Sequence, residues 1–184
     1  MEPPQSTILI VEDEQRLADI FTTWLSAEYE VLTAYDGKAA LSYLHRDIDA
    51  VLLDRRMPGM TGDEVLKELR HRGVEAPVGM VTAVEPDFDI IEMGFDDYVV
   101  KPVSRDGLFE LVEELLSLSN YDDIIQRYFE LTSKKVALEE SKSEADLETS
   151  AEYAALLEEY EKVKSMADSE IGKLTDSDDF TKLF

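Results

Sequence analysis

Short apolar runs and amphipathic stretches alternate through the first 118 residues, and this alternation constrains the fold more than any other feature of the sequence. The apolar runs are short enough to be buried strands, which we expect at residues 7–11, 30–34, 50–53, 77–82 and 98–100. Buried strands that alternate with amphipathic segments are typical of a parallel sheet whose strands are joined by crossover helices.

Apolar residues between these strands recur at helical spacing. In the first such stretch Leu17, Phe21 and Leu25 lie four residues apart, with Ile20 and Trp24 beside them, which predicts a helix over residues 16–27. Further helices are expected over 38–44, over 63–72, and from an N-cap at Ser104 to about residue 118. These units fit an α/β fold, a flavodoxin-like doubly wound five-stranded parallel sheet of order 2-1-3-4-5.

The rest of the chain changes character and predicts an antiparallel helical hairpin. Residues 120–173 contain two apolar stripes at helical spacing, separated by the polar segment 141–150, which we expect to form a turn. Neither arm has the sustained heptads of a coiled coil, so its apolar face needs the other arm, the first domain or a second chain as a partner. The stripes comprise Ile124, Tyr128, Leu131 and Leu138, and Tyr153, Leu156, Tyr160, Val163 and Ala167.

We therefore expect four parts: an N-terminal tail at 1–5, an α/β domain at 6–119, a helical domain at 120–173, and a loose acidic tail at 174–184. The first residues lack a secretory signal, and no apolar run approaches the roughly 18 residues of a membrane span. This predicts a cytoplasmic protein without membrane contact. The absence of cysteine excludes disulfides, thiolate catalysis and cysteine-bound metals.

The formal net charge is -24, and the acidity extends over both parts of the chain. Residues 119–184 alone contain 17 acidic and 8 basic side chains. Nucleic acid is therefore not a default partner, because phosphate binding depends on clustered Lys and Arg. Acidity this widespread is typical of a halophilic protein in a salty cytosol; the alternative is an acidic docking surface for a basic partner.

Polar side chains follow the expected strands where the site of an open α/β sheet forms. Glu12 and Asp13 follow the first strand, Asp54 the third, Thr82 the fourth, and Lys101 the fifth. Three carboxylates at contact distance repel by about 4 kcal/mol per pair at 4 Å and an effective dielectric of about 20. Lysine supplies one balancing charge, and Mg²⁺, which prefers oxygen ligands, is the expected metal.

Such a site is suited to phosphoryl chemistry. A carboxylate beside a divalent cation and an ammonium group is placed to attack phosphorus and become an aspartyl phosphate. The Thr82 hydroxyl would then turn onto a phosphoryl oxygen and pull the following loop inward. The two histidines, His45 and His71, lie in expected helices away from this edge, so zinc is not expected.

Four motifs in one order carry a family resemblance. They are ILIVEDE at 8–14, LDRRMPGMTG at 53–62, Thr82-Ala83, and DYVVKP at 97–102. From about residue 7 to 118 the chain resembles the receiver domain of two-component response regulators. The resemblance implies that Asp54 is the phosphoacceptor, and that Glu12, Asp13 and the backbone carbonyl of Arg56 are further Mg²⁺ ligands. It also implies that Thr82 and Tyr98 are switch residues. Lys101, which would precede a cis bond to Pro102, is implied as the phosphoryl-binding lysine.

The interval from Thr82 to Lys101 is shorter than this resemblance leads us to expect, and Pro86 interrupts it. The fourth helix should therefore be short or degraded. Because the family's usual output face includes that helix, its common dimer mode is not carried over. Residues 120–172 resemble, through motifs such as Gln126-Arg127-Tyr128, the HalX-type helical domain that follows receivers in haloarchaeal proteins, a resemblance that implies no defined activity.

The expected function is a phosphorelay response regulator that accepts phosphate from a sensor histidine kinase or phosphotransfer protein and has no enzymatic activity beyond its own phosphorylation and dephosphorylation. An aspartyl-phosphate hydrolase is the alternative, but it usually needs a second acid where Arg56 stands. The hairpin contains no histidine to carry phosphate. As output, we favour homodimerisation or protein docking through the hairpin over direct DNA binding, which needs a basic recognition helix.

Overall fold

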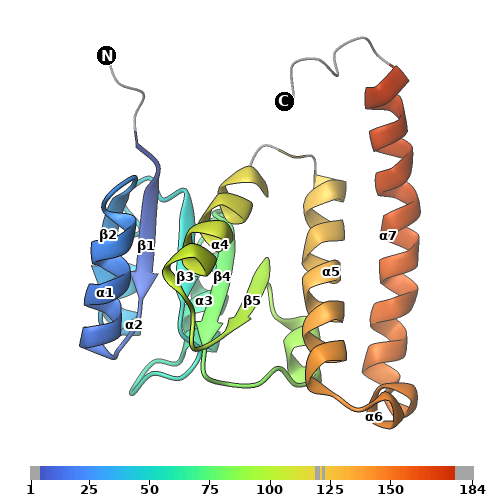
Figure 1. Cartoon of the computed structure of the whole chain (residues 1–184), viewed down its shortest axis with the longest axis horizontal. Helices are drawn as coiled ribbons and strands as arrows, with labels where there is room; N and C mark the ends of the chain where they lie inside the picture. Colours follow the sequence, from blue (N-terminus) through green and yellow to red (C-terminus); the bar gives the residue numbers. More distant parts are fainter. Residues whose placement is uncertain (1–4, 119–120, 122, 177–184) are drawn as a thin grey trace.

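The computed structural model describes residues 5–118, 121 and 123–176. Its centre is a five-stranded parallel sheet of order β2-β1-β3-β4-β5, which confirms the predicted fold class and strand order (Figure 1). The strands are β1 (Thr7–Val11), β2 (Glu30–Ala34), β3 (Ala50–Leu53), β4 (Val78–Thr82) and β5 (Asp97–Val100).

Helices cover both faces of this sheet. On one face α1 (Gln15–Leu25) and α4 (Arg105–Leu118) pack on Ile8 and Ile10 of β1. On the other, α2 (Gly37–Ser42) and α3 (Gly62–His71) pack on Leu9 and Val11. Successive residues of a strand point to opposite faces, so a strand covered on both sides must be apolar throughout, as β1 is.

Local signals fix two of the helix starts beside the site. The Ser104 hydroxyl accepts a hydrogen bond from the amide of Gly107 at 3.1 Å, which confirms the predicted N-cap of α4. At the start of α3, Thr61 and Glu64 form a reciprocal capping box. Both caps hold loops that follow strands at the carboxyl edge of the sheet.

The C-terminal part is the predicted antiparallel hairpin, with α5 (Asp123–Ser141) and α7 (Ala151–Asp176) side by side (Figure 1). The expectation that 141–150 is only a turn was wrong, because α6 (Glu144–Thr149) forms there behind an N-cap at Ser143. The last helix also includes residues 174–176, which we assigned to the loose tail. The remainder of that tail, and residues 1–4 of the N-terminal one, lie outside the described residues.

Between β4 and β5 the chain forms one short 3-10 helix, η1 (Phe88–Glu92), in place of an α-helix. This confirms that the fourth helix of the α/β domain is degraded. The hairpin covers the sheet there instead, because α5 contacts β5 and both α5 and α7 contact η1. Leu131 and Leu138 of α5 belong to the same buried core as Ile90 and Phe95.

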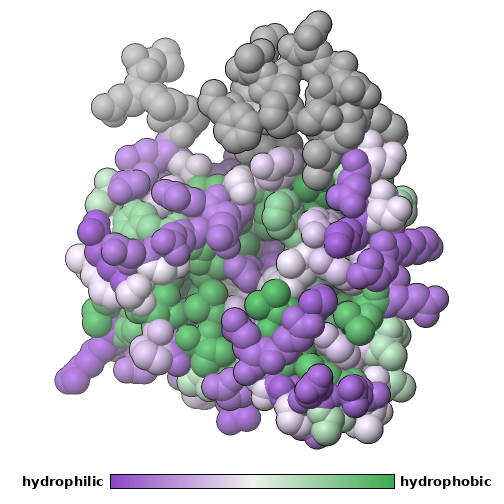
Figure 2. Space-filling view, turned by 45° about the vertical axis from the view of Figure 1, so that its right-hand side comes forward, coloured by the Kyte–Doolittle hydropathy of each residue, from purple (hydrophilic) through white to green (hydrophobic). Residues whose placement is uncertain are grey.

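Figure 2 shows hydrophilic side chains over much of the face that carries the hairpin, with apolar patches between them. Six large apolar or aromatic side chains in the described part of the chain are exposed, including Phe129 and Val136 on α5. Among the described residues, we find no helix that combines the length and the hydropathy needed to cross a membrane.

Candidate functional site

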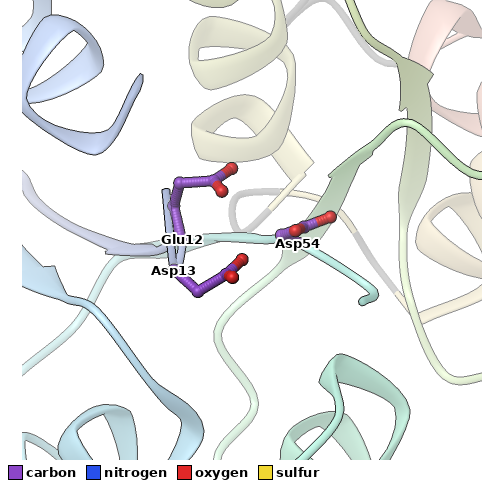
Figure 3. A group of neighbouring side chains, drawn as sticks. All are labelled: Glu12, Asp13 and Asp54. Carbon is purple, nitrogen blue, oxygen red and sulfur yellow. The ribbon is translucent and has the colours of Figure 1, made fainter. Parts of the chain in front are cut away.

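Three acidic side chains meet at the carboxyl edge of the sheet. Glu12 and Asp13 follow β1, Asp54 follows β3, and carboxylate oxygens from all three lie within 4.8 Å of one another (Figure 3). The two strands are adjacent, and the amide of Asp54 donates to the carbonyl of Val11 at 2.9 Å. Parallel pairing thus brings together acids that are far apart in the sequence, as predicted.

Lys101 reaches this cluster from the end of β5. Its Nζ lies 2.5 Å from Oε2 of Glu12 and 3.6 Å from Oδ2 of Asp54. The backbone holds it there, because the amide of Lys101 donates to the carbonyl of Thr82 at 2.9 Å. The bond from Lys101 to Pro102 is cis, as predicted. The predicted lysine therefore faces both a ligand candidate and the phosphoacceptor candidate.

The cluster is buried and short of positive charge. Glu12 is 3% and Asp54 7% exposed. Burial raises the pKa of the Glu12 carboxyl above its ordinary value, while the bonds from Lys101 and from the amide of Glu14 act in the opposite direction. Three carboxylates facing one ammonium group form an oxygen-rich donor set that fits Mg²⁺.

The two predicted switch residues meet at the backbone of Val84. Thr82 is fully buried at the end of β4, and its hydroxyl accepts from the Val84 amide at 3.3 Å. The Tyr98 hydroxyl donates to the Val84 carbonyl at 2.7 Å. Burial is the main cause that raises the pKa of this tyrosine. The loop after β4 is thus held from both switch positions.

The loop after β3 folds back closely on the phosphoacceptor candidate. The amide of Gly62 donates to the Arg55 carbonyl at 2.8 Å, and a Cβ atom on Gly62 would lie only 2.1 Å from the backbone oxygen of Asp54. Only glycine allows this approach. The Arg56 side chain is exposed in this loop, and the role of its carbonyl as a metal ligand remains a prediction.

Sequence reasoning gave no role to Arg55, although it directly follows Asp54. Its guanidinium bonds Asp63 at 3.0 Å and also pairs with Asp89 of η1. Burial lowers the pKa of Arg55, but the two carboxylates outweigh burial and raise it above its ordinary value. The sequence contained no signal for the Asp89 contact, because the two residues are separated by 34 positions and by a β-strand.

The histidines play no part in this cluster. His45 is exposed in the turn after α2 and not in the helix where we expected it, and its Nδ1 lies 2.8 Å from the carbonyl oxygen of Ser42. His71 is exposed at the end of α3. Neither belongs to the acidic cluster, which is the one group of potential metal-binding side chains found among the described residues.

Two curated proteins are similar to this chain in sequence. A protein of Haloferax volcanii that carries the name of a transcriptional regulator is 50% identical over 136 residues, covering 73% of this chain and 23% of its own. Sensory transduction protein RegX3 of Mycobacterium tuberculosis is 42% identical over 123 residues, covering 64% of this chain and 54% of its own. The chain therefore spans about half, or less, of the length of these curated relatives.

Solved structures match the α/β part. The Francisella response regulator 1452 receiver domain has a TM-score of 0.58 and 29% identity, covering 62% of this chain and 98% of its own. Response regulator TrrA from Thermotoga maritima, solved in complex with Mg²⁺-BeF, has a TM-score of 0.55 and 34% identity, covering 60% and 99% respectively.

Two family models match consecutive parts of the chain. The model described as response regulator receiver domain matches residues 8–113, and the model described as HalX domain matches residues 117–184. Receiver domains generally bind Mg²⁺ in an acidic pocket, and they are not a classical enzyme family. The chain belongs to the response regulators of two-component signalling, with a receiver domain followed by a HalX domain.

Proposed function

We propose that this receiver accepts a phosphoryl group on Asp54, in a Mg²⁺-dependent reaction, from a sensor histidine kinase or a phosphotransfer protein. The observation that carries the proposal is that the Asp54 carboxylate lies within 4.8 Å of the other two acids of the cluster and 3.6 Å from the ammonium group of Lys101. No other acidic cluster of this kind occurs in the described part of the chain.

Each residue has a defined task in this transfer. An Asp54 oxygen forms a bond to phosphorus while the bond from phosphorus to the donor's histidine nitrogen breaks, and its electron pair stays on that nitrogen. Lys101 pairs with the incoming phosphoryl oxygens and exchanges part of its contact with Glu12 for them. Glu12, Asp13, Asp54 and the carbonyl of Arg56 would hold Mg²⁺, which when bound would supply positive charge to balance those oxygens.

The phosphoryl group carries a charge of about -1.5 to -2 in place of the single charge of the free carboxylate, in a site that is already anionic. Thr82 turns its hydroxyl from the Val84 amide toward a phosphoryl oxygen and draws the loop after β4 inward. Tyr98 is bonded to the same residue, so its hydroxyl must follow or release the Val84 carbonyl. The two switch residues therefore respond together.

For output we propose protein–protein contact through the hairpin, by homodimerisation or by docking to a target. Its charge supports this choice over direct DNA binding, because residues 119–184 contain about twice as many acidic as basic side chains. DNA binding through these helices remains the second candidate, since the Haloferax volcanii relative is named for transcriptional regulation. We do not propose a hydrolase, because Arg56 occupies the position of its second acid.

Acetyl phosphate with Mg²⁺ tests the acceptor, with intact mass as the readout. We expect the wild type and an Asp47→Asn control to gain one phosphoryl group, because Asp47 is exposed and outside the cluster. Asp54→Asn should gain none. Phosphate uptake by Asp54→Asn, or its loss in Asp47→Asn alone, would refute the assignment.

A further inference from the structure

The segment between β4 and β5, residues 83–96, is attached on one side to the phosphorylation site. Its first turn is fixed by Tyr98, whose hydroxyl donates to the Val84 carbonyl. Its 3-10 helix is fixed by the ion pair between Asp89 and Arg55. The position of the segment is therefore set by two residues that adjoin the site.

The opposite side of the same segment is attached to the hairpin. Lys134 of α5 donates to the carbonyl of Ile91 at 2.8 Å, and Lys142 lies 2.8 Å from Asp87. The Lys142 ammonium also lies 5.4 Å from the centre of the Phe88 ring. These bonds join the segment to the second half of α5 and to the turn that follows it.

The Lys134 side of this junction is buried, whereas Lys142 and Asp87 pair at the surface. The Lys134 side chain is only 1% exposed, and its ammonium lies 5.3 Å from the centre of the Phe95 ring and 2.6 Å from Glu130. Ile90 and Phe95, both fully buried, belong to one core with residues of α5 and α7. Packed cores change between discrete arrangements rather than deforming smoothly. A shift of the segment must therefore change how the hairpin packs against it.

Arg55 places this segment relative to the phosphoacceptor. It is covalently joined to Asp54, its side chain is 11% exposed, and it bridges Asp63 of α3 and Asp89 of η1. The guanidinium is forked and bonds Asp63 through two nitrogens, so this largely buried side chain links the two half-exposed carboxylates in a defined geometry. The segment is therefore held at its start by Tyr98 and at its middle by Arg55, so a change at Asp54 and Thr82 acts on a segment that is fixed at two points.

We propose that Arg55 and the segment 83–96 couple phosphorylation to the seating of the hairpin, so that the hairpin is released from η1 when Thr82 draws the loop inward. This proposal rests on the phosphorylation of Asp54 proposed above. Arg55 acts as a positioning residue, and Lys134 and Lys142 are the contacts through which the shift reaches α5.

Hydrogen exchange of the full chain, with and without acetyl phosphate and Mg²⁺, tests the release, and intact mass gives the phosphorylated fraction in each sample. On full phosphorylation, we expect amide exchange in α5 and in the described part of α7 to become at least about tenfold faster. Unchanged exchange there at full phosphorylation would overturn the proposal.

Variants of the resting protein test the coupling without any phosphate. Arg55→Ala and Asp89→Asn should each speed exchange in α5, and Arg55→Lys, which keeps one charge, should restore part of the protection. The matched control is Arg72→Ala, which removes an exposed pair with Glu68 on α3 and should change nothing in the hairpin. Protection of α5 that survives Arg55→Ala refutes the coupling, whatever the result at Asp54.

The same variant gives a second readout after treatment with acetyl phosphate. Arg55→Ala should still gain one phosphoryl group, but the exchange of its hairpin should be the same with and without it. If phosphorylation speeds exchange in the hairpin of Arg55→Ala as much as in the wild type, Arg55 does not have the proposed role. If neither protein gains phosphate, the proposed acceptor fails, and the resting comparison alone decides the coupling.

Discussion

Lys134 of α5 donates a hydrogen bond to the carbonyl oxygen of Ile91 in η1 from a side chain that is almost completely buried. Replacing this lysine by alanine leaves the Ile91 carbonyl without its donor and leaves Glu130 with Arg127 as its remaining partner. We expect Lys134→Ala to lower the free energy of unfolding by about 2 kcal/mol, since removing one partner of a buried hydrogen bond leaves the other unsatisfied. Urea unfolding at neutral pH measures this.

The neighbouring lysine is the control for that change. Lys135 forms a half-exposed pair with Glu139 at 2.8 Å one turn further along the same helix. Lys135→Ala should cost less than about 1 kcal/mol, because exposed pairs contribute little. Equal costs for the two variants would show that Lys134 does not hold the junction.

Gly62 allows α3 to begin against the backbone of Asp54. We expect Gly62→Ala to lower the unfolding free energy by about 2 kcal/mol or more and to slow phosphate uptake, because its Cβ meets the Asp54 carbonyl oxygen at 2.1 Å. Gly94→Ala is the matched variant, since the nearest atom there, Cγ of Arg70, is 3.6 Å away, which is an ordinary van der Waals distance. Thermal unfolding and phosphate uptake followed by intact mass compare the two variants. If Gly62→Ala is as stable and as readily phosphorylated as Gly94→Ala, the close approach is contradicted.

Magnesium should stabilise the folded chain through the acidic cluster. At a concentration about 100 times its dissociation constant, Mg²⁺ should raise the unfolding free energy by about 2.7 kcal/mol. Asp13→Asn should remove most of this gain. Without metal the same variant should be more stable than the wild type by at least about 1 kcal/mol, because the repulsions of Asp13 with Glu12 and with Asp54 are both gone. Thermal unfolding at increasing Mg²⁺ concentration measures this gain. A gain in Asp13→Asn as large as in the wild type would contradict the prediction.

Stability should rise as the pH falls from 7 toward about 5. Burial raises the pKa of Asp96, despite its bonds to the Val78 amide and Arg70, and burial beside Asp97 raises that of Glu114. A raised folded-state pKa contributes stability that is complete below the unfolded pKa and is lost as the pH rises through the folded one.

The opposite sign applies to Asp87, whose pKa is lowered by its bond to Lys142. Its contribution is present above the unfolded pKa of about 3.9 and is lost as the pH falls through the folded value. Urea unfolding of the wild type and Asp96→Asn between pH 7 and about 3 checks both signs. A variant as pH-dependent as the wild type would exclude Asp96 as a source of the gain.

The fold and the convergence of the acidic site were predictable because both follow from strand patterning. Alternation fixes which segments are strands, and parallel pairing places their carboxyl ends, with Asp13, Asp54 and Lys101, at one edge. Patterning failed where tertiary contacts decide. Ile20 was placed in an apolar helical stripe, yet its side chain is 44% exposed.

The seat of the hairpin could not be read from the sequence either. Its apolar stripes left three partners open, and the structure selects two of them, the opposite arm and the first domain. The deciding residues are polar. Nothing in the sequence distinguishes Lys134 from an exposed helical lysine, although its side chain is 1% exposed. The role of Arg55 depends on its pair with Asp89, which only the folded structure brings together.

The 3-10 helix between β4 and β5 makes the two halves of this protein dependent on each other. A receiver with a complete helix at that place would have no room for Leu131 and Leu138, and this receiver without its hairpin would present Ile90 and Phe95 to water. Chimeras that exchange either half alone should therefore aggregate. Only a chimera that exchanges the β4–β5 segment and the hairpin together should keep this core covered.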